Sequence, residues 1–240
     1  MSRYDKLDGS VALVTGAAGH IGSAVCQLLA DNGVRVALID KDLTRAESVA
    51  SQISASSGTQ CKAFACDLME EASIKVLCAT IENHYGQLDF IVNNAAFYDD
   101  TPGWGVPYEE EGYEAWLKVL RVNTLAPFFL IQGFTPLLKA SGLAAIVNVG
   151  SMYAHTAPDP ALYADTNMTN PCAYAVSKAG LVQMSRWLST ILAPEVRVNS
   201  VTPGGIERGQ ADVFRERYYQ RTPLGRMANE QDIAEAIVFL

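Results

Sequence analysis

The sequence predicts an α/β fold: a single domain built on a doubly wound parallel sheet with helices on both faces. The main observation is an alternation, repeated about six times, of short apolar or β-branched runs with longer amphipathic segments. In such a pattern, each right-handed crossover between parallel strands returns a helix onto the sheet. The 240 residues also contain no linker, internal repeat or low-complexity tract, so we expect one domain over residues 1–240.

The expected elements follow one another as strand-and-helix pairs. In chain order the pairs are 11–16 with 21–32, 35–40 with 43–54, 61–67 with 71–86, 88–96 with 113–140, and 144–151 with 173–193, before a sixth strand over 196–205. Residues 152–171 are rich in Pro, Asp, Asn and Thr, which predicts a loop, and residues 207–226 predict a short helix or lid. A last helix is expected after its N-cap Asn229, with Asp232 three residues on.

Composition and charge argue against several classes of protein. A hydrophobic fraction of 49% and a charged fraction of 18% are typical of a globular chain with a sizeable core. The net charge of −8 disfavours a general nucleic-acid or anionic-membrane binder. The polar start and short apolar runs predict neither a secretory signal nor a membrane span. The five cysteines lack a C-x-x-C pair and the three histidines lack ligand spacing, so we expect no disulfide framework, no metal and a cytoplasmic location.

The stretch TGAAGHIG lies between the first expected strand and the first expected helix, with Gly16, Gly19 and Gly22 spaced three apart. Glycines at such a junction allow backbone N–H groups and the helix N-terminus to approach a pyrophosphate. We therefore predict a dinucleotide-binding turn that includes the intervening His20 and Ile21. A solvated His20 is an equal alternative to a phosphate contact.

Asp40 ends the second expected strand, 18 residues after Gly22. A carboxylate in that position accepts hydrogen bonds from the adenosine ribose hydroxyls and repels a 2′-phosphate. The cofactor expected is therefore NAD rather than NADP. The neighbouring Lys41 could receive that phosphate and leaves NADP as the alternative.

Polar side chains gather at the ends of later strands and on one helix. Tyr174 and Lys178 are four residues apart and share a helix face, where an ammonium group favours the phenolate and lowers the tyrosine pKa. Ser151 and Asn94 end two apolar strands, where they face a ligand crevice. Asn123 is a polar residue in an otherwise apolar helix, where it could also be a satisfied buried amide. A chance pair on a solvated helix is the alternative for Tyr174 and Lys178.

Taken in order, these motifs resemble the short-chain dehydrogenase/reductase family over essentially the whole chain. The matching features are TGAAGHIG at 15–22, CDL at 66–68, NNAA at 93–96, Asn123, Ser151, YAVSK at 174–178 and RVNSVTPGGI at 197–206. The resemblance implies a Rossmann-type domain that transfers hydride between a nicotinamide ring and a carbinol or carbonyl carbon. The cofactor carries the hydride, while the protein supplies orientation and the proton.

The resemblance also implies a role for each matching residue. Tyr174 would be the general acid/base, Lys178 would hold the nicotinamide ribose, Ser151 would bind the substrate oxygen, and Asn123 would maintain a water path for protons. The further cofactor contacts that it implies are Asp67 and Leu68 near the adenine, Asn94 and Ala95 along the cofactor, and Pro203, Gly204 and Ile206 over the nicotinamide. The long helices at 113–140 and 173–193 would build a homotetramer or homodimer.

Two features depart from the classical branch of this family. The spacing T-G-x-x-G-x-x-G and the separation of 23 positions from Ser151 to Tyr174 are similar to the extended branch of nucleotide-sugar epimerases and dehydratases. The remaining motifs favour the classical branch, and no room exists for a separate substrate domain. Family members usually continue to a final strand, so the resemblance predicts that the C-terminal strand is missing or truncated after Leu240.

The segments around the expected crevice suggest the kind of substrate. The loop at 152–171 carries hydroxyl-recognising groups, namely Tyr153, His155, Asp159, Tyr163, Asp165 and Asn167. Such a lining suits a polyol or sugar, although an exposed loop is an equal alternative. The lid carries Arg208, Arg215, Arg217 and Arg221, which would meet a phosphate or carboxylate, or belong to a solvated helix face.

The function expected is an NAD-dependent oxidoreductase that interconverts a secondary hydroxyl and a ketone on a polar, sugar-like or polyol substrate. One alternative is an NADPH-dependent 3-oxoacyl-thioester reductase, which Asp40 disfavours. A second is a nucleotide-sugar epimerase or dehydratase with tightly bound NAD. A third is a non-catalytic nucleotide-binding sensor or scaffold, which the intact set of Asn123, Ser151, Tyr174 and Lys178 disfavours.

Overall fold

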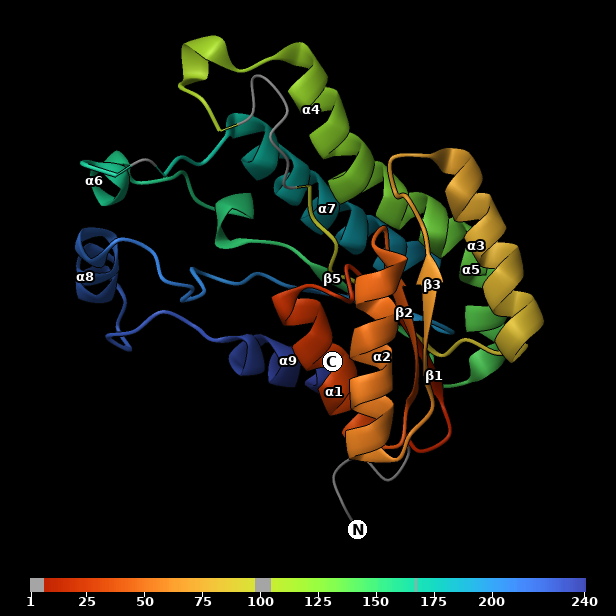
Figure 1. The fold of residues 1–240 in the computed structure, drawn as a ribbon. Helices are drawn as coiled ribbons and strands as arrows, with labels where there is room; N and C mark the ends of the chain where they lie inside the picture. Colours follow the sequence, from red (N-terminus) through yellow and green to blue (C-terminus); the bar gives the residue numbers. More distant parts are fainter. Residues whose placement is uncertain (1–6, 98–104, 167) are drawn as a thin grey trace.

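The computed structural model describes residues 7–97, 105–166 and 168–240, and a parallel sheet forms the centre of this part of the chain (Figure 1). Its strands are β1 (Val11–Thr15), β2 (Arg35–Asp40), β3 (Cys61–Ala65), β4 (Phe90–Asn93), β5 (Ala145–Val149) and β6 (Arg197–Val201). They lie in the order β3-β2-β1-β4-β5-β6 with every pairing parallel. The order reverses between β1 and β4, and ligands of such sheets bind at that point, beyond the carboxyl ends of the strands.

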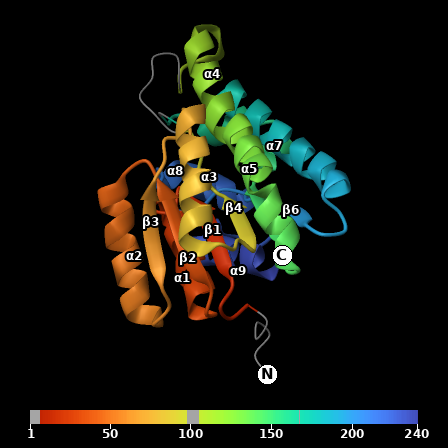
Figure 2. The same cartoon turned by 90° about the vertical axis from the view of Figure 1, so that its right-hand side faces the viewer.

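Helices cover both faces of the sheet (Figure 2). Those described are α1 (His20–Asp31), α2 (Leu43–Ser57), α3 (Glu71–Tyr85), α4 (Tyr113–Leu120), α5 (Ala126–Ser141), α6 (Pro160–Tyr163), α7 (Cys172–Ile191), α8 (Asp212–Arg221) and α9 (Glu230–Phe239). The apolar residues of α1, α2 and α9 pack on one face, and those of α3, α5 and α7 pack on the other. The predicted α/β fold with helices on both faces is confirmed.

The predicted helix at 113–140 is one continuous rod of three parts. α4 runs into a π-helical segment, Arg121–Leu125, which runs directly into α5. A π-helical turn holds an extra residue, and such turns are frequent at functional sites. The sequence predicts one helix over 113–140 and does not distinguish this segment from the turns on either side.

The two segments predicted to interrupt the strand–helix alternation, 152–171 and 207–226, both contain short helices. The segment at 152–171 contains a short 3₁₀ helix, Met152–Ala154, and α6, whereas the sequence predicts only a loop. The expected short helix within 207–226 is α8. α6 and α8 lie side by side on the left of Figure 1 and share an apolar cluster. α9 begins as predicted, since Asn229 and Asp232 form a reciprocal capping box.

Candidate active site

The glycine-rich turn between β1 and α1 has the geometry of a phosphate-binding cradle. Gly19 is the N-cap of α1, an end that receives no side-chain cap within the described ranges. A Cβ at Gly19 would lie 3.2 Å from the Gly16 carbonyl oxygen, and a Cβ at Gly22 would lie 2.2 Å from the same atom. Side chains there would therefore fill the turn or separate it from the helix. His20 is exposed and Ile21 half-buried beside this open helix end, which fits a pyrophosphate.

Asp40 joins the end of β2 to this turn. Its Oδ2 accepts a hydrogen bond from the Ala18 N–H at 3.0 Å, and its Oδ1 accepts one from the Asp42 N–H at 3.2 Å. The Asp40 side chain is half-buried, whereas Lys41 is exposed between two carboxylates. The carboxylate therefore lies at the carboxyl end of β2, where ribose hydroxyls would bind.

Asn94 and Ala95 hold the turn from the side of β4. The Asn94 Nδ2 donates to the carbonyl oxygens of Thr15 at 3.0 Å and Gly16 at 3.1 Å. The N–H groups of Asn94 and Ala95 both donate to Thr15 Oγ1 at 3.1 Å. Because its amide is engaged with the backbone of Thr15 and Gly16, Asn94 braces the glycine-rich turn.

Asp67 and Leu68 follow β3, next to the end of β2 in the sheet. Asp67 is exposed, and its Oδ1 accepts a hydrogen bond from the Met69 N–H at 2.9 Å. Leu68 is half-buried and packs against two apolar clusters. The pair therefore offers one polar and one apolar group at the edge where the sequence predicts the adenine.

Ser151 and Tyr174 lie together beyond the carboxyl end of β5. Ser151 is 7% exposed and is the N-cap of the 3₁₀ helix. Burial raises the pKa of the Tyr174 phenol from its usual value, and a hydrogen bond with Ser151 partly offsets this rise. Since the hydroxyls of Ser151 and Tyr174 interact, both would reach the same substrate oxygen.

Lys178 lies one turn further along α7, and it does not have the predicted effect on the pKa of Tyr174. Its Nζ donates to the Val149 carbonyl oxygen at 2.6 Å and lies 5.9 Å from the centre of the Tyr174 ring. Burial lowers the pKa of the Lys178 ammonium to about 8. The predicted lowering of the Tyr174 pKa by Lys178 is absent here, because the burial of the phenol dominates.

Asn123 occupies the π-helical segment and is fully buried. Its Oδ1 accepts a hydrogen bond from the Phe97 N–H at 2.7 Å, and its Nδ2 donates to Ser177 Oγ at 2.9 Å. Ser177 Oγ in turn donates to the Tyr174 carbonyl oxygen at 2.7 Å. Asn123 is therefore the satisfied amide of the alternative interpretation, and it connects to the turn of α7 that carries Tyr174. Sequence reasoning missed Ser177, although it lies inside YAVSK.

The segment Pro203–Ile206 follows β6 and is held at both ends. The Pro203 carbonyl oxygen accepts from the Met152 N–H at 2.8 Å, and Ile206 forms a parallel bridge with Ala228. Between them, the Gly205 N–H donates to the Tyr218 hydroxyl of α8 at 2.6 Å. A Cβ at Gly204 would lie 2.6 Å from the same hydroxyl. Tyr218 was missed, because no local pattern connects it to a segment 13 residues earlier.

The lid arginines are engaged with the protein. Each pairs with a carboxylate: Arg208 with Glu230, Arg215 with Glu207 and Asp212, Arg217 with Asp165, and Arg221 with Asp159. Two of these pairs tie α8 to the segment around α6. The arginines are therefore already paired with carboxylates of the chain, and two of the predicted hydroxyl-recognising carboxylates, Asp159 and Asp165, are occupied in the same way.

The other candidates in the long segment separate into three groups. The hydroxyls of Tyr153 and Tyr163 hydrogen-bond each other at 2.5 Å, and both side chains are half-buried. His155 is exposed. Asn167 lies outside the described residues.

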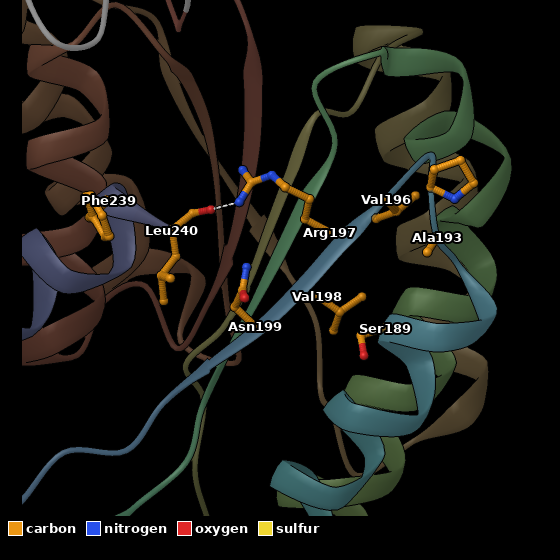
Figure 3. Close-up of a pocket in the computed structure, with 9 residues that line it drawn as sticks. Ser189, Ala193, Val196, Arg197, Val198, Asn199, Phe239 and Leu240 are labelled. Atoms are coloured by element: carbon orange, nitrogen blue, oxygen red, sulfur yellow. Dashed lines mark hydrogen bonds between the residues drawn. The ribbon is translucent and has the colours of Figure 1, made fainter.

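A hollow beside β6 is distinct from this site. Figure 3 shows that it is lined by the end of α7, by the strand and by the last residues of α9, where Arg197 hydrogen-bonds the Leu240 carbonyl oxygen. It contains none of the candidate cofactor or catalytic residues. Within the described ranges, no group of three or more His, Cys, Asp or Glu side chains could hold a metal. None of the helices in the same ranges has both the length and the hydrophobicity that a bilayer span requires.

Comparison with known proteins gives matches along the whole chain. A family model described as enoyl-(acyl carrier protein) reductase matches residues 16–240. The D-threitol dehydrogenase of Mycolicibacterium smegmatis is 32% identical over 98% of this chain and 86% of its own length. The 3-oxoacyl-[acyl-carrier-protein] reductase FabG of Thermotoga maritima is 31% identical over 98% of this chain and 91% of its own length.

Solved structures match equally fully. The RhlG/NADP active-site complex of Pseudomonas aeruginosa is 29% identical, with a TM-score of 0.85 over 98% of this chain and 90% of that one. The 3-ketoacyl-(acyl-carrier-protein) reductase of Brucella melitensis, complexed with NADH, is 28% identical, with a TM-score of 0.81 over 98% and 91%. Structures that resemble this chain therefore hold either form of the nicotinamide cofactor.

Proposed function

The chain belongs to the short-chain dehydrogenase/reductase family, and on that premise we propose that it is an NAD-dependent dehydrogenase of a polar, sugar-like or polyol substrate. It is an oxidoreductase that interconverts hydroxyl and ketone groups. The observation that carries the proposal is the meeting of Ser151 and Tyr174 beyond the carboxyl end of β5, with Lys178 buried on the next turn of the same helix.

The chain's own residues divide the work of the reaction. The nicotinamide, when bound, accepts the hydride of the carbinol carbon or supplies it to the ketone. Tyr174 exchanges the proton of the substrate oxygen, and Ser151 hydrogen-bonds the same oxygen. Lys178 orients the nicotinamide ribose. Asn123 holds the start of α7 through Ser177, which fixes the Tyr174 backbone.

The preference for NAD rests on the end of β2. Asp40 offers its carboxylate to the ribose hydroxyls, and the exposed Lys41 is flanked by Asp42 as well as by Asp40. A 2′-phosphate would meet two negative groups around one positive group, which disfavours NADP by electrostatic repulsion. Gly19 and the open N-terminus of α1 would hold the pyrophosphate.

A neutral, hydroxyl-rich substrate is favoured by the walls of the site. The lid arginines form ion pairs with the protein, while Tyr153 and Tyr163, whose hydroxyls hydrogen-bond each other, both interact electrostatically with Tyr174. The similarity to a D-threitol dehydrogenase points to the same substrate class. An NADPH-dependent 3-oxoacyl-thioester reductase is the second candidate, because FabG is almost as similar.

The test is a panel of polyols, sugars, sugar phosphates and nucleotide sugars, followed by the absorbance of NADH and NADPH. We expect oxidation of a neutral polyol with NAD, and little turnover with NADP at equal concentration. Tyr174→Phe should reduce kcat by at least about 1,000-fold, since proton transfer is removed, and leave NAD binding unchanged in a fluorescence titration. A strong preference for NADP with a 3-oxoacyl thioester would favour the second candidate. Sugar-nucleotide conversion without net NADH would indicate an epimerase or dehydratase.

We also propose a homodimer or homotetramer in the cytoplasm. Val176, Trp187 and Ile191 expose apolar surface along α7, and Leu125 does so on the neighbouring helix. Such a stripe on a small soluble protein indicates an interaction surface. Sedimentation of the purified chain tests the assembly, and a monomer at micromolar concentration would contradict it.

A further inference from the structure

Two tyrosine hydroxyls meet beside the proposed catalytic groups. Tyr153 follows Ser151 by two residues, and its N–H donates to Ser151 Oγ at 3.2 Å. Tyr163 ends α6, within the long segment between Ser151 and Tyr174, and brings its hydroxyl to 2.5 Å from that of Tyr153. Tyr174 is close enough to interact electrostatically with both. The pair therefore borders the position that the reacting oxygen would take.

The chemistry of the pair suits a substrate hydroxyl. Two phenols carry two O–H donors, and their mutual hydrogen bond uses one of them. One donor and several lone pairs remain for a ligand, while a substrate hydroxyl both donates and accepts. Burial and the hydrogen bond with the Tyr163 hydroxyl raise the pKa of Tyr153, so Tyr153 stays neutral.

Among the described residues, the side chains of α6 and α8 that surround this pair are either apolar or already bonded within the protein. We call this surface the lid wall. The wall around Tyr163 is built from the apolar cluster of Leu162, Phe214, Tyr218 and Met227. The Tyr218 hydroxyl accepts from Gly205, and the hydroxyl of the neighbouring Tyr219 donates to Glu207. The arginines of α8 are held in ion pairs. The wall therefore presents hydroxyls without a net charge.

We propose that Tyr153 and Tyr163 form the subsite for the hydroxyl group on the carbon next to the reacting one, so that the enzyme selects a neutral vicinal diol over the matching monoalcohol. This inference rests on the proposed function and names its substrate class more narrowly. A site that hydrogen-bonds a substrate hydroxyl rejects an analogue without it, because its own buried polar groups then lose their partner.

The test compares butane-2,3-diol with butan-2-ol, which differ only in the neighbouring hydroxyl. The wild-type enzyme with NAD should show a kcat/KM at least about 100-fold higher for the diol. Tyr163→Phe should lower kcat/KM for the diol by about 10-fold to 100-fold and leave butan-2-ol unchanged, because one donor is lost. The reverse reaction with NADH, on 3-hydroxybutan-2-one and butan-2-one, should show the same pattern.

Tyr219→Phe is the matched control, because it removes a lid hydroxyl that is committed to Glu207. It should leave the ratio of the two substrates unchanged. If Tyr163→Phe slows both alcohols equally, the pair supports the loop only and the subsite is refuted. A wild-type enzyme that oxidises both alcohols equally well refutes the subsite alone. One that oxidises neither refutes the proposed function and the subsite with it.

Discussion

Replacement of the buried Lys178 by methionine should change the way stability depends on pH. Lys178 is 2% exposed, and burial lowers the pKa of its ammonium from 10.5 to about 8. At about 1.4 kcal/mol per pKa unit, the charged form costs the folded protein about 3 kcal/mol. Methionine has no charge to bury, but it leaves the Val149 carbonyl oxygen without the Nζ donor, which costs about 1–3 kcal/mol at any pH.

The direction follows from proton binding. Between pH 8 and 10.5 the unfolded chain keeps a proton on Lys178 that the folded protein has released. Stability rises with pH wherever the unfolded state binds more protons. The buried lysine therefore destabilises the folded protein by the full amount below pH 8, and this destabilisation disappears as the pH approaches 10.5. The wild type should gain about 3 kcal/mol relative to Lys178→Met between pH 7 and pH 10.5.

The assay is urea unfolding of the cofactor-free proteins at pH 7 and pH 10.5, followed by circular dichroism. Other titrating groups are common to both proteins and cancel in the comparison. Lys75→Met is the control, since Lys75 is 74% exposed and pairs with Glu71 at the surface. It should show no such change. An equal difference between wild type and Lys178→Met at both pH values would refute the reasoning.

Two further substitutions test the cofactor turn. In a thermal melt, Gly22→Ala should destabilise the fold by about 1–3 kcal/mol, because its Cβ would lie 2.2 Å from the Gly16 carbonyl oxygen. The control is Gly180→Ala, whose Cβ would lie 3.6 Å from Thr124, and it should be neutral or stabilising in the same measurement. Asp40→Asn should raise the ratio of kcat/KM for NADP to that for NAD by at least about tenfold, because one repelling charge is removed, and an unchanged ratio would contradict the role given to this carboxylate.

The fold could be predicted because its signals are local. The alternation of apolar strands and amphipathic helices needs no knowledge of distant contacts, and neither does the capping box of Asn229 and Asp232. The glycine turn was also readable, since Gly16, Gly19 and Gly22 lie within one short junction. The parallel sheet then brings the ends of β1, β2, β4 and β5 to one edge.

The parts of the site that could not be predicted depend on long-range contacts. Asp159 and Arg221 pair across 62 residues, and Asp165 and Arg217 pair across 52. Each looks like an available polar group in the sequence, and only the docking of α8 on α6 shows that it is occupied. The predicted lowering of the Tyr174 pKa by Lys178 is wrong for the same reason. Distant segments bury the phenol, and this burial raises its pKa.

The π-helical segment divides the continuous helix formed by α4 and α5 into two parts that pack in different places. Successive residues of an α-helix turn by about 100°, so the extra residue between Arg121 and Leu125 rotates everything after it by about that angle. Val119 and Val122 enter the small cluster around Phe97, whereas Leu130 and Phe134, beyond the π-helical segment, enter the main core under the sheet. The rod therefore contributes to two apolar clusters, and Asn123 lies between the residues that enter them.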